Sequence, residues 1–190
     1  MRGLSIKQPW AWAIVNAGKR IENRSWPTHY RGPVLIHASG MRGNKQALLE
    51  EVEDGWESVM YMANASGVDL SHVKPNLGMF RQHAGGVVGR ANLVDCVEAY
   101  DSPWFVGPWG FVLQDVEPTP FVQWPGSLGL WNVPARLLVE LQNPKPRERA
   151  MATEPCSSVR SLAELQNPKP RERGPQIELP FVDDRGGRYE

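Results

Sequence analysis

Three charged side chains that could act on a ligand together lie close in the chain: Lys19, Glu22 and Arg24, within the segment GKRIENR. If this segment is a β-strand, Glu22 and Arg24 project from one face, because successive side chains alternate between the two faces. A carboxylate can accept a hydrogen bond from an exocyclic amine or activate water, and an arginine can bind a phosphate or a base edge. The combination suits a polar, planar ligand.

The same three residues also have a simpler, structural interpretation. Spacing alone favours a group of exposed ion pairs, which are common on strands and contribute little to stability. If there is a cleft, the state of Lys19 decides its role. Partial desolvation favours the neutral amine of Lys19, which can act as a base or a nucleophile. Tight pairing with Glu22 favours the protonated ammonium, which can contact a phosphate or a base but cannot act as a nucleophile.

Hydrophobic periodicity and turn residues predict the elements that position this segment. Residues 4–7 are expected to form an opening strand, residues 9–17 a short helix ended by Gly18, and residues 20–26 the next strand. Further strands are predicted at 33–39, 85–100, 109–116, 120–124 and 128–133, and further helices at 44–63 and 135–143. This order predicts an α+β fold with a small β-barrel, for which a sandwich is the alternative.

Composition and charge restrict the possible functions. The 190 residues carry no net charge, which argues against a general attraction to polyanions, but residues 1–42 hold seven Lys and Arg against one acidic residue. Such a basic lobe suits local recognition of a nucleotide. Two cysteines and the lack of a long apolar run predict a cytoplasmic protein. No metal-ligand spacing, phosphate loop or dinucleotide fingerprint is present, so we expect neither a metal nor a cofactor.

Two separated segments resemble one known family. Residues 4–39 resemble the N-terminal half of the ASCH domain, and GKRIENR matches the family's GxKxxExR signature, except that the first glycine falls on Ala17. Residues 107–134 resemble the closing strands of the same family, in the same order. The resemblance covers roughly residues 3–134 and predicts an ASCH domain over 1–136, with a variable helical insertion at about 44–85.

The resemblance implies a fold and a function. ASCH domains are similar to PUA domains, with a β-barrel and a base-sized cleft beside the first helix and the signature loop. We therefore expect a PUA-like barrel that binds RNA, another single-stranded nucleic acid or a modified nucleoside. In this cleft Gln8 can pair with a base edge, and Trp10 or Trp26 can stack on the base. The residues expected around it are Lys7, Gln8, Trp10, Lys19, Glu22, Arg24 and Trp26.

The family also implies an enzymatic alternative. Some small members are hydrolases that remove an acetyl group from cytidine derivatives, and others have reported nuclease activity. Lys19 corresponds to the catalytic lysine of the deacetylating members, but the position of their hydroxyl residue falls on Glu22. Their separate carboxylate would have to be Glu22, Asp95 or Glu98. In this hypothesis the protein is an amidohydrolase of acylated cytidine or a ribonuclease, with Lys19 and Glu22 as the catalytic groups.

The C-terminal residues, 137–190, are predicted to form a helix followed by a flexible tail. The segment ELQNPKPRER occurs twice, at 140–149 and 164–173. Two copies are too few for a solenoid, so a duplication within the tail is the simpler explanation. The excess of basic residues allows a second explanation, in which the two copies form a duplicated basic binding segment for phosphates or for a partner.

One short motif suggests a third function, an interaction protein that acts through its tail. The segment QIELPF resembles the peptide that binds the bacterial sliding clamp, with Gln176, Leu179 and Phe181 as its anchors. A linear peptide can insert such side chains into a groove on a partner. The alternative is a terminal strand that pairs with the barrel.

Overall fold

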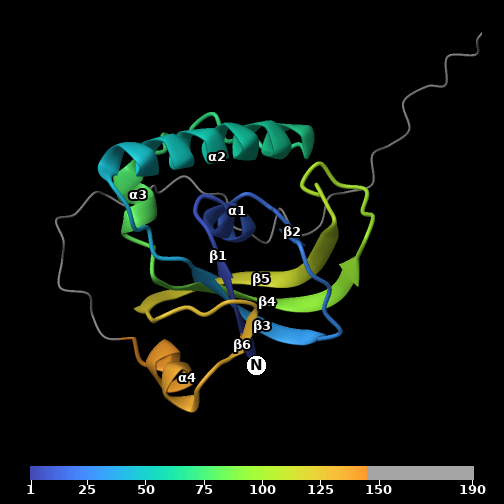
Figure 1. The fold of residues 1–190 in the computed structure, drawn as a ribbon, viewed down its shortest axis with the longest axis vertical. Coiled ribbons are helices and arrows are strands. Elements are labelled where there is room, and N and C mark those ends of the chain that lie inside the picture. The colour runs from blue at the N-terminus through green and yellow to red at the C-terminus, as the bar shows by residue number, and fades with distance from the viewer. Residues whose placement is uncertain (145–190) are drawn as a thin grey trace, which may run out of the picture. The chain divides into compact units, whose positions relative to one another are not determined.

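The computed structural model describes residues 1–144, which contain six strands and four helices (Figure 1). In chain order these are β1 (Arg2–Ile6), α1 (Trp10–Asn16), β2 (Ile21–Arg24), β3 (Gly32–Ala38), α2 (Lys45–Ala65), α3 (Leu77–Arg81), β4 (Gly86–Val97), β5 (Trp109–Gln123), β6 (Leu130–Asn132) and α4 (Ala135–Gln142). The second copy of the repeat and the QIELPF segment lie outside the described residues.

The strands form one curled sheet in the order β2-β5-β4-β3-β1-β6. Strands β1 and β3 are parallel, and every other neighbouring pair is antiparallel. The register between β3 and β4 shifts once, and that between β4 and β5 shifts three times, and such bulges increase the curl of a sheet. The predicted α+β architecture, a curled sheet with flanking helices, is confirmed.

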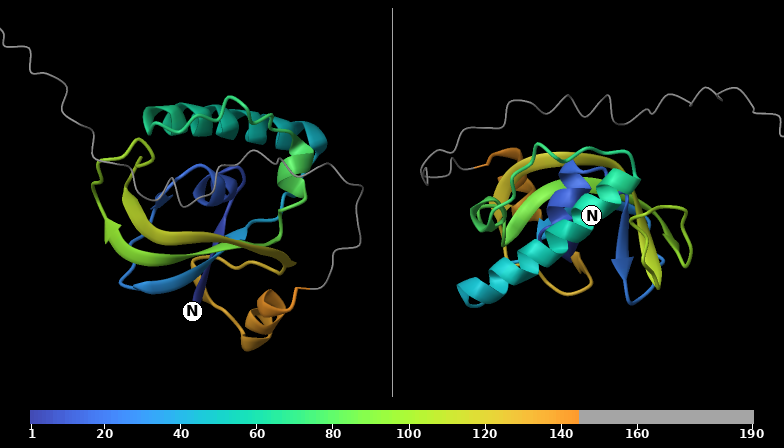
Figure 2. Two further views of the ribbon diagram at one scale, coloured as in Figure 1. Left: turned by 180° about the vertical axis from the view of Figure 1, so that it is seen from behind. Right: turned by 90° about the horizontal axis from the view of Figure 1, so that it is seen from above.

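Helix α1 lies between the sheet and the long helix α2, as two views agree (Figures 1 and 2). Ala11 and Ile14 belong to the apolar cluster that contains the sheet residues, whereas Ala13 and Ala17 belong to the cluster built with α2. The small residues on α1 let both layers approach closely. Helix α2 crosses the start of α1 at Gly55, where a Cβ atom would lie 2.6 Å from Cδ of Pro9.

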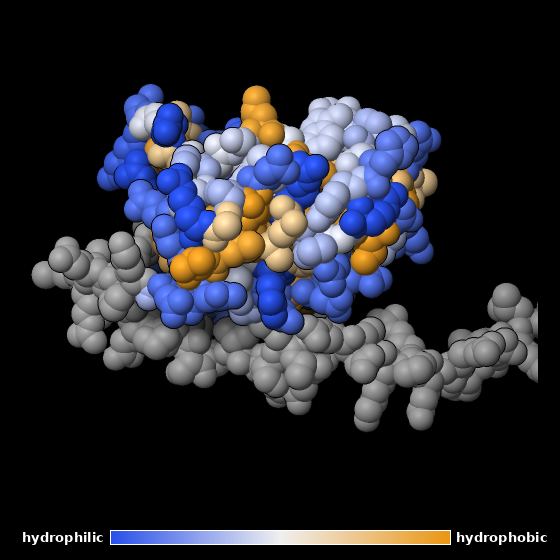
Figure 3. Space-filling view, turned by 90° about the horizontal axis from the view of Figure 1, so that it is seen from below, coloured by the Kyte–Doolittle hydropathy of each residue, from blue (hydrophilic) through white to orange (hydrophobic). Residues whose placement is uncertain are grey.

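Helix α4 packs on the opposite side of the sheet from α1 (Figure 1). Its Leu137 is fully buried in a third cluster with Val87 and Trp124. The face at the bottom of Figure 1 is mainly hydrophilic, with a short apolar strip near its middle (Figure 3). Isolated exposed apolar side chains such as Leu128 are normal on a folded domain.

Two sequence-based predictions of elements were wrong. Residues 109–116 and 120–124 form one strand, β5, rather than two strands around a turn. Beyond Val112, β5 pairs only with β4, so its other edge is open. A strand tolerates proline where the missing N–H would face such an open edge, and the prolines of this segment therefore do not end β5. Residues 64–85, expected to be irregular, include α3, whose N-cap Asn76 accepts a hydrogen bond from the Met79 amide at 2.9 Å.

Candidate functional site: a buried charge network at the end of the first helix

The turn after α1 places Lys19 inside the molecule. Gly18 has a φ of +70°, in the left-handed region that favours glycine, so this residue makes the turn and Ala17 need not. The Lys19 amide then donates to the carbonyl oxygen of Ala13 at 3.2 Å. Lys19 as a whole residue is only 1% exposed, although lysine is among the residues least often buried.

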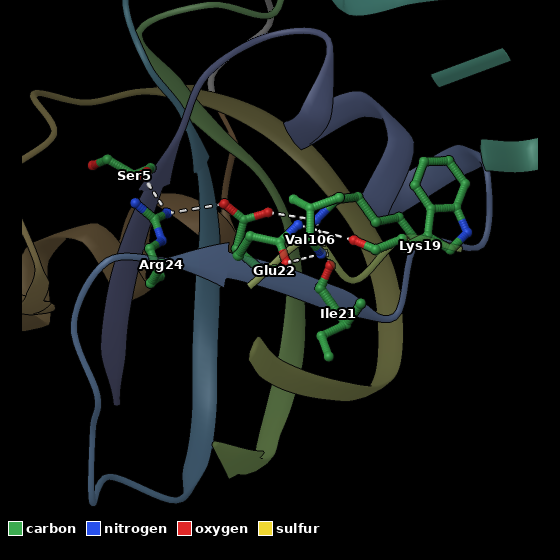
Figure 4. Close-up of polar contacts among 8 residues, drawn as sticks. Ser5, Lys19, Ile21, Glu22, Arg24 and Val106 are labelled. Carbon is green, nitrogen blue, oxygen red and sulfur yellow. Dashed lines mark hydrogen bonds and ion pairs between the residues drawn. The ribbon is translucent and has the colours of Figure 1, made fainter. Parts of the chain in front are cut away.

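A continuous set of polar contacts starts at Lys19 (Figure 4). Its Nζ donates to the carbonyl oxygen of Ile21 and to Oε2 of Glu22, the latter at 2.6 Å. The other carboxylate oxygen, Oε1 of Glu22, lies 3.3 Å from a guanidinium nitrogen of Arg24. That same nitrogen, Nη2, donates to the backbone oxygen of Ser5 at 2.8 Å. We refer to Lys19, Glu22, Arg24 and Ser5 as the charge network.

The charge network links two strands that are not neighbours in the sheet. Strand β2 lies at one edge, and β1 lies next to the opposite edge, beyond β5, β4 and β3. The pairing of β1 with β6 ends at Leu4, one residue before Ser5. Arg24 therefore joins the end of β2 to the end of β1 across the open side of the curled sheet.

Burial decides the electrostatics of the network. Desolvation lowers the pKa of Lys19, and the adjacent Glu22 carboxylate opposes this shift. Glu22 is 7% exposed and lies between two cationic groups. The structural interpretation as exposed ion pairs, which spacing favoured, is therefore wrong. The predicted placement of Glu22 and Arg24 on the same face of a strand is confirmed.

The opposite face of β2 holds residues that the sequence analysis missed. Asn23 Nδ2 donates to the carbonyl oxygen of Trp104 at 2.9 Å, and Asn23 Oδ1 accepts from the Val106 amide at 3.0 Å. These bonds fix the loop between β4 and β5 against β2. Alternation along the strand predicts that Asn23 points away from Glu22. It does not predict the hydrogen-bond partners of Asn23, because these lie 81 and 83 residues further along the chain.

The structure separates the other predicted site residues from Lys19. Lys7 is exposed and pairs with Glu51 of α2 at 2.6 Å. Gln8 is buried, and its Oε1 accepts from the Trp12 amide at 3.1 Å. Trp10 is half-buried and packs against the clusters on both sides of α1. Trp26 is half-buried, and its ring meets that of Phe111 edge to face at 5.0 Å.

The carboxylates considered as catalytic partners of Lys19 lie elsewhere, apart from Glu22. Asp95 is exposed and pairs with Arg31 at 2.8 Å. Glu98 is also exposed. Within residues 1–144, neither carboxylate makes a hydrogen bond or ion pair with Lys19.

Two kinds of feature are missing from the part of the chain that the structure describes. Residues 1–144 contain no group of three or more His, Cys, Asp or Glu side chains that could hold a metal ion. In the same residues we find no helix with the length and apolar character needed to span a membrane.

Comparison with known proteins identifies related sequences. The family model described as the ASCH domain matches residues 4–120. Activating signal cointegrator 1 of Mus musculus is 31% identical over 94 residues, and the protein of the same name from Homo sapiens is 29% identical over 94 residues. Each alignment covers 50% of this chain but only 14% of the relative. The chain thus matches a small part of each relative.

The charge network predicts an asymmetry between two substitutions. Glu22→Gln leaves Lys19 buried beside Arg24 with no anion, so we expect a loss of about 3–5 kcal/mol in the free energy of unfolding. Lys19→Met should cost less, because Glu22 keeps Arg24 as its partner. Urea unfolding followed by circular dichroism measures both variants, and the double variant should cost less than the sum.

The ion pair of Lys7 and Glu51 is a matched control, because its N–O distance equals that of Lys19 and Glu22 but its side chains are exposed. Lys7 and Glu51 also lie 2.6 Å apart, with 74% and 45% of their side chains exposed. The cycle of Lys7→Met and Glu51→Gln should give a coupling energy below about 1 kcal/mol. Equal coupling energies in the two cycles would contradict the importance that we give to burial.

The lowered pKa of Lys19 predicts how stability depends on pH. Between the pKa of Lys19 in the folded protein and its ordinary value of 10.5, the unfolded chain binds more protons than the folded chain. The free energy of unfolding should therefore gain a contribution that increases as pH rises through this window. Urea unfolding from neutral pH to pH 10.5 should show that Lys19→Met lacks this contribution. Identical pH profiles for the two proteins would show that the burial of Lys19 does not lower its pKa.

Proposed function

Because the chain belongs to the ASCH domain family, for which nucleic-acid binding in general is supported, we propose that it binds RNA or a modified nucleoside beside the GKRIENR loop. In this proposal the protein is a recognition module for one unpaired base and the phosphate next to it. Arg24 is the contact residue, and Lys19 and Glu22 hold it in position.

The observation that carries the proposal is the position of the Arg24 guanidinium. Glu22 and the Ser5 carbonyl hold its Nη2, and its Nε is buried without a hydrogen-bond partner among residues 1–144. About a fifth of the side chain is exposed, in contrast to Lys19. An arginine whose guanidinium is fixed in this way is preorganised, and its exposed part can donate to a phosphate or a base edge, which accept such bonds well.

Neighbouring residues supply a base-stacking group and a second cation. Trp26 follows Arg24 by two residues and is half-buried, with one edge contact to Phe111. Lys7 follows Ser5 by two residues, and its ammonium is exposed despite the ion pair with Glu51. An aromatic residue and a second cation thus follow two members of the charge network along the chain, a combination that suits a single-stranded nucleic acid, whose bases are free to stack.

Replacement of Arg24 tests the binding proposal. We expect Arg24→Ala to weaken the binding of a labelled single-stranded RNA by about tenfold or more, because one charge-assisted hydrogen bond is lost. Fluorescence anisotropy at two salt concentrations measures the dissociation constants, and the wild-type affinity should fall as salt rises. A DNA strand of the same sequence separates recognition of RNA from recognition of any single strand.

Arg90→Ala is the matched control, because Arg90 is an exposed arginine whose ion pair with Glu117 lies away from the charge network. It should leave the affinity unchanged. If Arg24→Ala remains folded and binds RNA as tightly as the wild type, the site proposed at the GKRIENR loop is wrong.

A second candidate function, a hydrolase acting on acylated cytidines or on RNA, is favoured by one observation. The pKa of Lys19 is lowered by burial, and its Nζ contacts a carboxylate at 2.6 Å. A neutral lysine amine can act as a base or nucleophile, and Glu22 can position a water molecule. The same burial leaves Lys19 without access to solvent, so a substrate would first have to displace part of the loop that covers it.

Incubation with acylated cytidines and short RNAs, followed by liquid chromatography, tests the hydrolase. Turnover should disappear in Lys19→Ala and in Glu22→Ala while both variants keep the wild-type circular dichroism spectrum. Lys45→Ala is the control, because it removes an exposed lysine at the start of α2 that has no role in either proposal. Absence of products with the wild-type protein, or undiminished turnover in folded variants, would eliminate this candidate.

A further inference from the structure

A hollow of about 220 Å³ lies against α1. Its lining includes Gln8, Trp12 and Val15 of the α1 segment, Val88 of β4, and Pro118 and Thr119 of β5. Lys19, Glu22 and Arg24 do not line it. Pockets for drug-sized ligands measure about 300–1,000 Å³, so the size of this hollow suits a ligand of one or two rings.

Among the described residues, the only ionisable side chain that lines the hollow is the imidazole of His83. None of its lining residues is an aspartate, glutamate, lysine or arginine. Most of the lining is apolar or aromatic. Transfer of an ion from water into such a site would be unfavourable, whereas a flat uncharged ring would bury apolar surface against Trp12, Val15 and Val88.

Gln8 offers a fixed hydrogen-bond donor to the hollow. Its side chain is more than nine-tenths buried, and its Oε1 accepts from the Trp12 amide at 3.1 Å. This bond sets the orientation of the side-chain amide. The NH₂ group then has no hydrogen-bond partner among residues 1–144 and remains available to an acceptor in the hollow.

Thr119 offers a second polar group without a partner. Its Oγ1 is buried and makes no hydrogen bond within the described residues. Buried polar atoms are nearly always satisfied by protein, water or ligand, so this hydroxyl is available to a hydrogen-bonding group in the hollow. Asn16 also lines the hollow, and because its Nδ2 donates to the Trp12 carbonyl at 3.0 Å, its Oδ1 is free to accept.

We propose that this hollow binds one uncharged nitrogen heterocycle of nucleobase size, held between apolar walls by hydrogen bonds to the Gln8 amide and the Thr119 hydroxyl. The ring edge accepts from Gln8, exchanges a hydrogen bond with Thr119 and donates to Asn16. The heterocycle is either the base of a free nucleoside or one base of a bound strand. This inference goes beyond the function proposed for the GKRIENR loop, because it uses none of the residues of the charge network.

The test uses the full chain and the four nucleosides adenosine, guanosine, cytidine and uridine. Saturation-transfer NMR gives the dissociation constant of each. We expect at least one nucleoside to bind, Thr119→Val to weaken it about fivefold through the loss of one hydrogen bond, and Val88→Phe to abolish binding by filling the hollow. Thr119→Ser keeps the hydroxyl and should restore affinity, and Arg90→Ala should have no effect.

Thermal unfolding of each variant separates binding from folding. Thr119→Val replaces a buried hydroxyl that has no partner, so it should unfold at the wild-type temperature or higher. Loss of binding in a variant of unchanged stability therefore reports on the ligand contact.

Anisotropy with the labelled RNA distinguishes the two sources of the heterocycle. If the hollow variants weaken both nucleoside and RNA binding, the ligand is a base within a strand; if they weaken nucleoside binding alone, it is a free nucleoside. Failure of all four nucleosides to bind, or equal binding by wild type, Thr119→Val and Val88→Phe, would overturn the inference. The proposal for the GKRIENR loop would still stand in that case, because it depends on Arg24→Ala.

Discussion

The fold depends on a carboxylate that is buried between two cations. Glu22 is nearly inaccessible to water, and Lys19 and Arg24 contact its two carboxylate oxygens from both sides. Each cation is in turn fixed by a backbone oxygen, that of Ile21 for the lysine and that of Ser5 for the arginine. One carboxylate thus connects the turn after the first helix, the edge strand β2 and the end of β1.

This arrangement divides the roles among the signature residues. Lys19 and Glu22 satisfy each other inside the protein, whereas about a fifth of the Arg24 side chain is exposed to solvent. We propose that Arg24 contacts the phosphate of a nucleic acid and that the hollow beside α1 holds an uncharged ring. The two proposed sites share no residue, so each can be tested without the other.

Sequence reasoning identified α1, β2 and the shared face of Glu22 and Arg24, because periodicity and turn residues are local signals. It did not identify the burial of Lys19, since a charged residue after a glycine turn has the same local pattern whether its side chain points outward or inward. Gln8 was expected beside Lys19, but the Trp12 amide directs it to a different hollow. The hydrogen-bond partners of Asn23 could not be predicted either, because they lie in a loop more than 80 residues away in the sequence.

The close crossing of α2 over α1 at Gly55 and Pro9 has a consequence for anyone who redesigns this domain. The insertion looks dispensable in the sequence, since it interrupts the barrel strands and carries none of the signature residues. It nevertheless covers the outer side of α1 and buries Trp56 and Val59 there. A minimal barrel made by deleting this segment would expose an apolar helix to water, so the insertion has to be transplanted or replaced together with the helix beneath it.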